Sequence, residues 1–127
     1  MTRLLVAAPD PDYRLLVRLG LDGAPGFEPV LEAGGAEEVM ALAGRAAPDV
    51  LLLDISLPGA FALLARLAFA RVVLVSSAAP EELATLAAAA GAVGYIGKDL
   101  APTDLPAAIT DATRVVERLE AVLAKAA

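Results

Sequence analysis

Asp49-Val50-Leu51-Leu52-Leu53-Asp54, followed by Ile55-Ser56-Leu57-Pro58-Gly59, is the stretch that decides the fold. Four apolar residues in succession lead to the carboxylate of Asp54, and Pro58 and Gly59 then interrupt the chain. A continuous apolar run between turn signals predicts a strand buried on both faces, as in a parallel sheet covered by helices. Asp54 then stands at the carboxyl end of a central strand, where open α/β sheets bind their ligands. An aspartate that only caps a turn is the alternative interpretation.

The composition of the chain fits one globular domain that spans residues 1–127. Hydrophobic residues make up 58% of it, and much of that share is alanine. The net charge of −6 argues against direct binding of nucleic acid, which needs a basic surface. Because the chain has no cysteine and no histidine, disulfides, thiolate or histidine metal ligands and a histidine base are excluded.

The sequence also lacks signals for a membrane. The N-terminus has neither the apolar core nor the cleavage site of a signal peptide. The longest uncharged run, residues 83–97, is shorter than the roughly 20 residues of a membrane-spanning helix. We therefore expect a cytoplasmic protein that does not contact the membrane.

Strand patterns alternate with helix patterns along the whole chain. The second strand is expected at a sheet edge because it contains Pro29 and two glutamates. Asp10 and Thr103 are the predicted N-caps of the first and last helices. Five strand–helix repeats predict a parallel sheet with right-handed crossovers and helices on both faces. The predicted strands are 3–8, 27–33, 50–54, 71–76 and 93–96, and the predicted helices are 11–21, 36–46, 60–69, 80–90 and about 104–125.

The last predicted helix is longer than the sheet requires. About twelve residues, at about 1.5 Å each, suffice to cross a sheet, and this helix has about twenty. Its surplus turns are apolar on one side, so we expect them to pack on a partner or to lead into a further domain. The alternative is a frayed, alanine-rich tail. The apolar positions follow 4-3-4-3-4 spacing at Leu105, Ile109, Ala112, Val116, Leu119 and Leu123, and Ala108, Val115 and Val122 widen the stripe.

Polar side chains follow four of the five predicted strands: Asp10, Asp54, Ser76 and Lys98. Each is unremarkable alone, as a cap, a turn residue or a surface lysine. Because the carboxyl ends of parallel strands meet at one edge of a sheet, a carboxylate, a hydroxyl and an ammonium group are expected to converge there. The joint placement predicts a functional site.

Four motifs together give the chain a family resemblance. They are Asp10-Pro11-Asp12-Tyr13-Arg14; the stretch from Leu51 to Gly59; Val73-Leu74-Val75-Ser76-Ser77; and Gly94-Tyr95-Ile96-Gly97-Lys98-Asp99, with Pro102 and Leu105 beyond it. They resemble the receiver domain of two-component response regulators, including those with helix-turn-helix output domains, and the resemblance covers the whole chain. It implies a flavodoxin-like (βα)5 three-layer sandwich (CheY-like) with a five-stranded parallel sheet of order 2-1-3-4-5.

The resemblance also implies roles for individual residues. Asp54 would accept a phosphoryl group from a sensor histidine kinase, and Lys98 would pair with it and then with a phosphate oxygen. Ser76 would donate a hydrogen bond to the phosphoryl group, and Tyr95 would turn inward when Ser76 moves. The backbone carbonyl of Ser56 would bind the metal ion. The switch would be read, and a homodimer formed, on the face made by residues 81–90, 93–96 and 104 onward. A DNA-binding output domain would lie outside this chain.

One departure from the family bears on the metal. The family has two adjacent acids after the first strand, where this chain has Ala8 and Pro9. Mg²⁺ prefers oxygen ligands and neutralises charge on a transferring phosphoryl group. Asp54 is then left as the carboxylate on the ion, unless a shifted loop brings in Asp10. We expect Mg²⁺ binding to be weak or absent. The short link after Gly59 also predicts a truncated third helix.

Three functional hypotheses follow. The first is a phosphorylatable receiver, favoured by Asp54, Ser76, Tyr95 and Lys98. The second is an atypical receiver that signals without phosphorylation, through dimerisation, protein contacts or a small ligand, and Ala8 and Pro9 favour it. The third, an enzyme on the same fold, has no support from a glycine-rich phosphate loop, a nucleophile elbow or a histidine, so we do not expect an enzyme.

Overall fold

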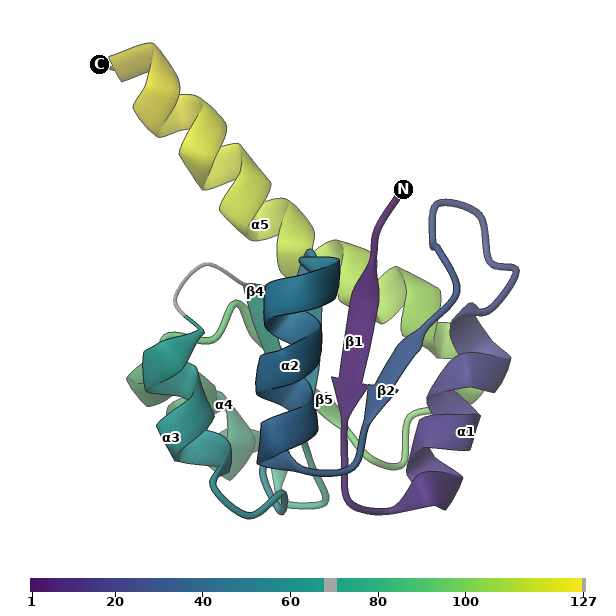
Figure 1. Ribbon diagram of the computed structural model, residues 1–127. Helices are drawn as coiled ribbons and strands as arrows, with labels where there is room; N and C mark the ends of the chain where they lie inside the picture. The colour runs from purple at the N-terminus through teal and green to yellow at the C-terminus, as the bar shows by residue number, and fades with distance from the viewer. Residues whose placement is uncertain (68–70, 127) are drawn as a thin grey trace.

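The computed structural model describes residues 1–67 and 71–126, and in residues 115–117 it describes the backbone alone. Five strands form one sheet of order β2-β1-β3-β4-β5, in which every neighbouring pair is parallel (Figure 1). This confirms the expected (βα)5 order. The strands are β1 (Leu4–Ala7), β2 (Leu31–Ala33), β3 (Val50–Asp54), β4 (Arg71–Ser76) and β5 (Gly94–Gly97).

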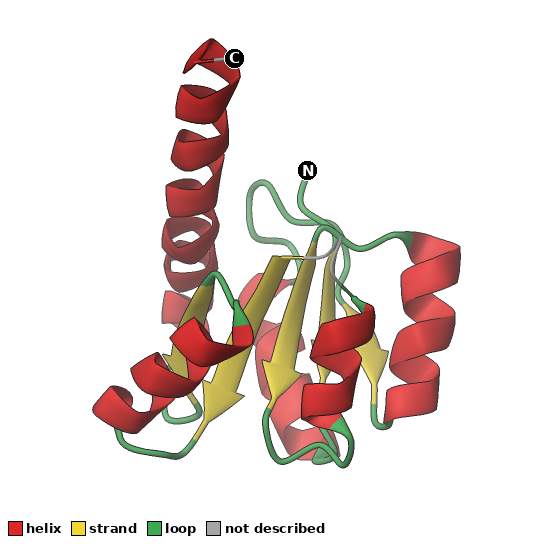
Figure 2. Cartoon of the chain, turned by 90° about the vertical axis from the view of Figure 1, so that its left-hand side faces the viewer, coloured by secondary structure: helices red, strands yellow, loops and turns green. Residues whose placement is uncertain are grey.

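Helices cover both faces of the sheet, as Figure 2 shows. Side chains of α2, α3 and α4 pack on one face of the strands, and those of α1 and α5 pack on the other, so two apolar cores enclose the sheet. The predicted three-layer sandwich is therefore confirmed. The helices are α1 (Pro11–Leu21), α2 (Ala36–Ala46), α3 (Ala60–Arg66), α4 (Pro80–Ala90) and α5 (Leu105–Ala126), and a 3₁₀ turn (Pro102–Asp104) precedes α5.

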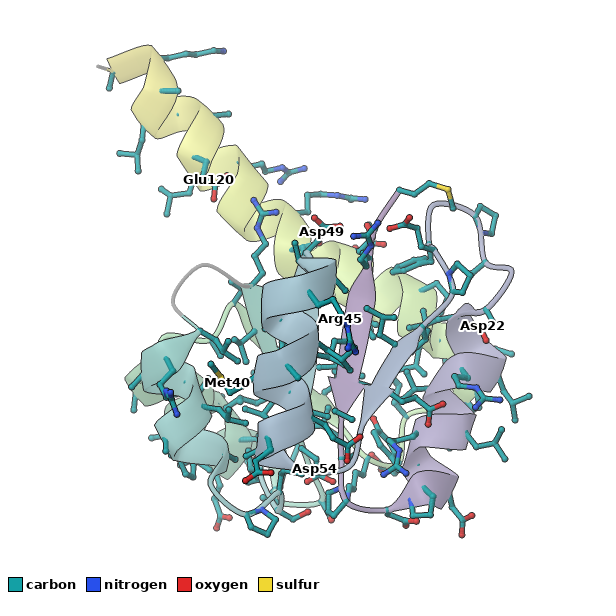
Figure 3. All side chains as sticks on the ribbon, viewed as in Figure 1. Asp22, Met40, Arg45, Asp49, Asp54 and Glu120 are labelled. Atoms are coloured by element: carbon teal, nitrogen blue, oxygen red, sulfur yellow. The ribbon has the colours of Figure 1, made fainter. Side chains whose placement is uncertain are left out.

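β3 occupies the centre of the sheet, between β1 and β4. All five of its residues are buried, because helices cover both of its faces. The prediction that this apolar run forms a strand buried on both faces is thus confirmed. β3 ends at Asp54, which lies at the carboxyl edge of the sheet, whereas Asp49 lies at the opposite edge (Figure 3).

Several predicted boundaries were wrong. Residues 27–30 are not part of β2: Phe27 forms an isolated bridge with Thr2, the Val30 amide donates to Asp22 Oδ1, and Pro29 has no amide to offer a neighbouring strand. β2 is nevertheless an edge strand, as expected. β5 begins and ends one residue later than predicted.

Two helices also differ from prediction. Helix α3 has seven residues against eleven in α2, which confirms the predicted truncation; it ends at Arg66, before the expected end at residue 69, and residues 68–70 lie outside the described part. Thr103 does not cap the last helix, because Pro102 occupies the first position of a 3₁₀ turn and Ala101 before it is extended.

Helix α5 has 22 residues and outruns the sheet. Leu105 and Ile109 are buried against the sheet, and α5 crosses β5 so closely that a Cβ added to Gly94 would lie 2.8 Å from Ala112 Cβ. The later turns project away from the body of the domain (Figures 1 and 2). Within the described residues, no helix is both long and apolar enough to cross a membrane.

Candidate functional site

The site forms around the carboxylate of Asp54. Its side chain is 1% exposed at the end of β3, and Lys98 Nζ, which follows β5, lies 2.6 Å from Oδ2. Because β4 separates β3 from β5, the long lysine side chain spans the carboxyl edge of the sheet to reach Asp54. The side chain of Lys98 is 27% exposed, so one partner of this ion pair is buried and the other reaches solvent.

Ser56 donates hydrogen bonds to the other carboxylate oxygen of Asp54, Oδ1. Its amide nitrogen lies 2.9 Å and its Oγ 2.8 Å from Oδ1, and both donate hydrogen bonds to it. A turn in which a carboxylate accepts the amide two residues ahead is a local preference of aspartate. The sequence interpretation considered only the carbonyl of Ser56 and missed its hydroxyl. The Asp-x-Ser spacing was the signal that could have revealed this contact.

Tyr13, from α1, completes the surroundings of Lys98. Lys98 Nζ lies 5.6 Å from the centre of the Tyr13 ring, within range of a cation–π contact. Burial, and secondarily the negative charge of Asp54, raise the pKa of the Tyr13 phenol to about 12. The phenol therefore stays neutral at physiological pH. Sequence analysis placed Tyr13 on the first helix without a role, since apolar packing is the common use of such a position.

The end of β1 holds no carboxylate. Ala8 is buried, and the carbonyl oxygens of Ala8 and Pro9 accept hydrogen bonds from Arg14 Nη1 at 2.6 and 3.3 Å. Arg14 Nε is anchored in turn by Glu32 at 3.2 Å. Asp10 is exposed and caps α1, accepting from the Asp12 amide at 2.9 Å, as predicted for that role. A guanidinium group thus faces the carbonyls at this end of β1.

These residues do not fit a divalent metal ion. Across the described part of the chain, no three aspartate or glutamate side chains gather closely enough to hold one. Asp54 is already balanced by Lys98, and the nearby carbonyls of Ala8 and Pro9 are engaged by Arg14. Mg²⁺ needs several oxygen ligands in near-octahedral geometry, which one neutralised carboxylate does not supply.

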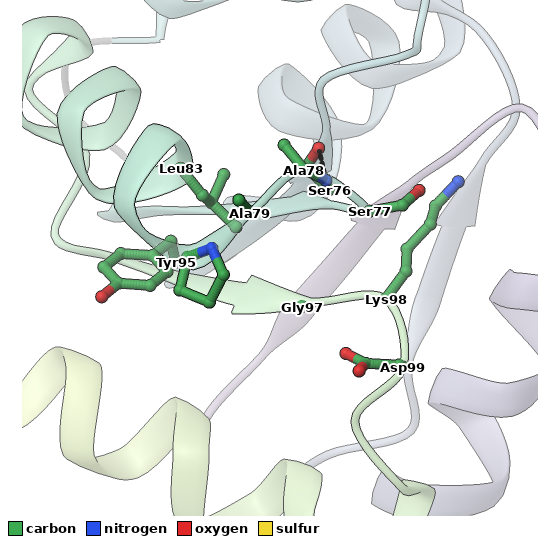
Figure 4. A pocket seen from close by; sticks show the side chains of 10 residues that line it. Ser76, Ser77, Ala78, Ala79, Leu83, Tyr95, Gly97, Lys98 and Asp99 are labelled. Atoms are coloured by element: carbon green, nitrogen blue, oxygen red, sulfur yellow. Dashed lines mark hydrogen bonds between the residues drawn. The ribbon is translucent and has the colours of Figure 1, made fainter.

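Ser76 and Tyr95 line a cavity beside this ion pair. Ser76 is buried, and its Oγ accepts a hydrogen bond from the Ala78 amide at 3.0 Å. The cavity has a volume of about 560 Å³. In Figure 4, Lys98 extends away from Tyr95, whose side chain lies beside Leu83 and is 43% exposed. The described lining is Ser76, Ser77, Ala78, Ala79, Pro80, Leu83, Tyr95, Gly97, Lys98 and Asp99.

The fold, the edge site and the sequence together identify the family. The profile of the family described as "Response regulator receiver domain" matches residues 4–110. This chain belongs to that family. Its members act in two-component signal transduction, where they interact with histidine kinases and typically bind Mg²⁺ at the phosphorylation site. Receiver domains are generally signalling modules rather than enzymes. Membership of this family therefore favours the two signalling hypotheses over the hypothesis of an enzyme on the same fold.

Relatives and solved structures agree with this assignment. The chain is 36% identical over 110 residues to the DNA-binding transcriptional activator DevR/DosR of Mycobacterium tuberculosis, covering 79% of this chain and 51% of that protein. It is 34% identical over 97 residues to the uncharacterized transcriptional regulatory protein YxjL of Bacillus subtilis, covering 72% and 43%. The chain thus spans about half the length of these relatives.

Among solved structures, the signal receiver domain of the putative response regulator NarL from Mycobacterium tuberculosis has a TM-score of 0.75 and 28% identity. That match covers 89% of this chain and 96% of the other. A CheY-like receiver domain protein from Methanospirillum hungatei has a TM-score of 0.76 and 26% identity, covering 93% and 98%. Both matches support a receiver domain.

Proposed function

We propose that Asp54 is the phosphoacceptor of this receiver domain and takes its phosphoryl group from the phosphohistidine of a sensor kinase. The observation that carries the proposal is the buried Asp54 carboxylate at the end of β3 with Lys98 Nζ at 2.6 Å. A carboxylate oxygen would attack phosphorus while the bond from phosphorus to histidine nitrogen breaks. Both lone pairs of Oδ1 are engaged by Ser56, so Oδ2, which faces only Lys98, is the better nucleophile.

The switch would run through Ser76 and Tyr95. Ser76 Oγ would leave the Ala78 amide and donate to the phosphoryl group, and the loop after β4 would move with it. Tyr95 is half exposed beside the cavity and would turn inward. The change would be read on the face formed by α4, β5 and α5, where a homodimer would also form.

A second candidate is a receiver that signals without phosphorylation. The end of β1 favours it, because Ala8 and Pro9 supply no carboxylates and their carbonyls are bonded to Arg14. The Asp54–Lys98 pair is already neutral, so the pocket has no excess negative charge for a cation to balance. Phosphoryl transfer to Asp54 is accordingly expected to be slow, with Mg²⁺ binding weak or absent.

The output is proposed to lie outside the chain. The relatives with "transcriptional" in their names are about twice as long as the segment they share with this chain. A DNA-binding output domain is therefore the proposed recipient of the signal. This domain, with its acidic balance, would not contact the DNA itself.

The test is phosphorylation of the purified domain. It is incubated with acetyl phosphate and millimolar Mg²⁺, and intact mass is followed over time. A mass gain of one phosphoryl group that Asp54→Asn abolishes supports the first candidate. Asp10→Asn is the matched control, because Asp10 caps α1 and Asn also caps well. If the wild type gains no mass, phosphoryl transfer to Asp54 is excluded and the second candidate stands.

A further inference from the structure

Lys98 is fixed at both ends of its side chain. Its backbone amide donates to the Ser76 carbonyl at 3.0 Å, which ties the residue to the end of β4. Its ammonium nitrogen lies 2.6 Å from Asp54 Oδ2 and 5.6 Å from the centre of the Tyr13 ring. The ammonium group is therefore held between a carboxylate and an aromatic face, beside the oxygen that the proposed phosphoryl transfer would use.

The Tyr13 ring is a rigid support for this ammonium group. Tyr13 is 7% exposed, and its ring packs in the core on the side of the sheet that α1 covers. Helix α1 lies directly against the turn that follows Lys98, since a Cβ added to Gly20 would overlap the carbonyl oxygen of Pro102. A lysine ammonium group by itself is a point charge on a flexible four-carbon stem. The buried ring limits where that charge can go.

A well-placed cation matters here because the end of β1 does not fit a metal ion. A phosphoryl group in transfer spreads negative charge over its oxygens, and a cation beside it stabilises that charge. Ala8 and Pro9 supply no carboxylate, and Arg14 bonds their carbonyl oxygens. Lys98 is the cation that the structure brings to Asp54. Its ammonium group has three N–H donors, so two remain for phosphoryl oxygens when one bonds to Asp54.

We propose that phosphoryl transfer to Asp54 proceeds without a divalent metal ion, with Lys98 as the cation and Tyr13 as the residue that positions it. This inference rests on the proposed role of Asp54 as the phosphoacceptor. With acetyl phosphate as the donor, Asp54 Oδ2 forms a bond to phosphorus, the bond from phosphorus to the acetyl oxygen breaks, and acetate leaves with the electron pair. No proton moves, and Lys98 stays protonated on the Tyr13 ring while it bonds to the phosphoryl oxygens.

The first test compares phosphorylation with and without a divalent ion. The purified domain is incubated with acetyl phosphate in excess EDTA or in millimolar Mg²⁺, and intact mass is followed over time. We expect the wild type to gain one phosphoryl group at the same rate in both conditions, and Asp54→Asn to gain none. A gain that requires Mg²⁺ would overturn the inference and leave the proposed function intact. No gain in either condition would overturn both.

The second test removes the aromatic face. Tyr13→Leu keeps an apolar side chain without the ring, and we expect it to slow phosphorylation in EDTA about tenfold, the effect of a cation–π contact at a partly desolvated site. Tyr13→Phe keeps the ring and should keep the wild-type rate. Val17→Ala is the matched control, because Val17 is buried one turn further along α1 and its truncation only loosens packing. Equal slowing by Tyr13→Leu and Val17→Ala would overturn the role of Tyr13.

The contact between Lys98 and Tyr13 is also tested without any phosphoryl donor. The NMR signals of the Lys98 ε-methylene protons report on a nearby ring through its ring current. We expect these signals to shift in Tyr13→Leu and to stay close to their wild-type positions in Tyr13→Phe. Lys98 signals that do not change in Tyr13→Leu would show that the ring does not position the ammonium group, whatever the outcome of the phosphorylation tests.

Discussion

The ends of β1 and β3 lie side by side in the sheet, and they differ in what they offer a phosphoryl group. At the end of β3, Asp54 is buried, paired with Lys98 and oriented by Ser56. At the end of β1, Ala8 and Pro9 supply no carboxylate, and their carbonyl oxygens accept hydrogen bonds from Arg14. A buried and paired carboxylate thus lies beside a strand end that supplies no carboxylate for a metal ion.

The largest expected effect comes from removing the partner of Asp54. Lys98→Met leaves a carboxylate that is 1% exposed without its counter-charge, and we expect a loss of about 3 kcal/mol in the free energy of unfolding. Urea denaturation at neutral pH measures it. Lys98→Met combined with Asp54→Asn is the control and should recover most of the loss. A loss no greater than that of a surface ion pair would mean that the β3 end is not a buried charge site.

Because of Tyr13, we expect the free energy of unfolding to depend on pH in the alkaline range. The pKa of its phenol is about 12 in the folded chain and about 10 when unfolded. Since the folded value is raised, the stabilisation is complete below pH 10 and is lost as pH rises through 12. It amounts to about 3 kcal/mol, at about 1.4 kcal/mol for each unit of pKa difference.

Tyr13→Phe removes the ionisable group but keeps the ring over Lys98. Its urea midpoint should therefore fall less than that of the wild type between pH 9 and 11. If the urea midpoints of the wild type and Tyr13→Phe fell equally with pH, Tyr13 would not be held neutral beside Asp54 and Lys98.

Ser56 is expected to contribute less to the free energy of unfolding than Lys98 does. Its hydroxyl donates to a buried carboxylate, and hydrogen bonds to charged groups contribute about 1.5 kcal/mol or more. We expect Ser56→Ala to cost about that much in chemical denaturation. Ser77→Ala is the matched control, since Ser77 is exposed and should change stability little. Equal effects of the two substitutions would remove Ser56 from the site.

Substitutions of Asp10, at the end of β1, are expected to have the smallest effect on stability. If it serves α1 as a cap, Asp10→Ala should cost about 1 kcal/mol, and Asp10→Asn should cost almost nothing. Thermal unfolding of the two variants measures both. A result in which Asp10→Asn alters phosphorylation of Asp54 while stability stays unchanged would place Asp10 in the site after all.

Much of the fold was predictable because buried parallel strands leave a plain signature. Leu51, Leu52 and Leu53 have no polar alternation, so burial on both faces followed directly, and the structure confirms it. The alternation of strands and helices then fixed which edge holds Asp54 and Lys98. The errors lie where local signals compete: Thr103 is a good cap residue, but Pro102 beside it set the geometry of the turn instead.

The finer parts of the site were not predictable, because they depend on where side chains turn in three dimensions. Arg14 reaches back across its own loop to the carbonyls of Ala8 and Pro9, and no spacing rule indicates that direction. Tyr13 occupies an ordinary apolar-face position, so only its distance to Lys98 marks it. The sequence placed Ala8 and Pro9 at the end of the first strand, and the structure shows that Arg14 donates hydrogen bonds to their carbonyl oxygens.

Calorimetric titration with Mg²⁺ tests the central claim most directly. The wild-type domain is compared with a variant that carries Ala8→Asp and Pro9→Asp, and each is also measured with Asp54→Asn. We predict no saturable binding to the wild type in the millimolar range, and saturable binding to the variant that depends on Asp54. Saturable, Asp54-dependent binding of Mg²⁺ to the wild type would contradict the account.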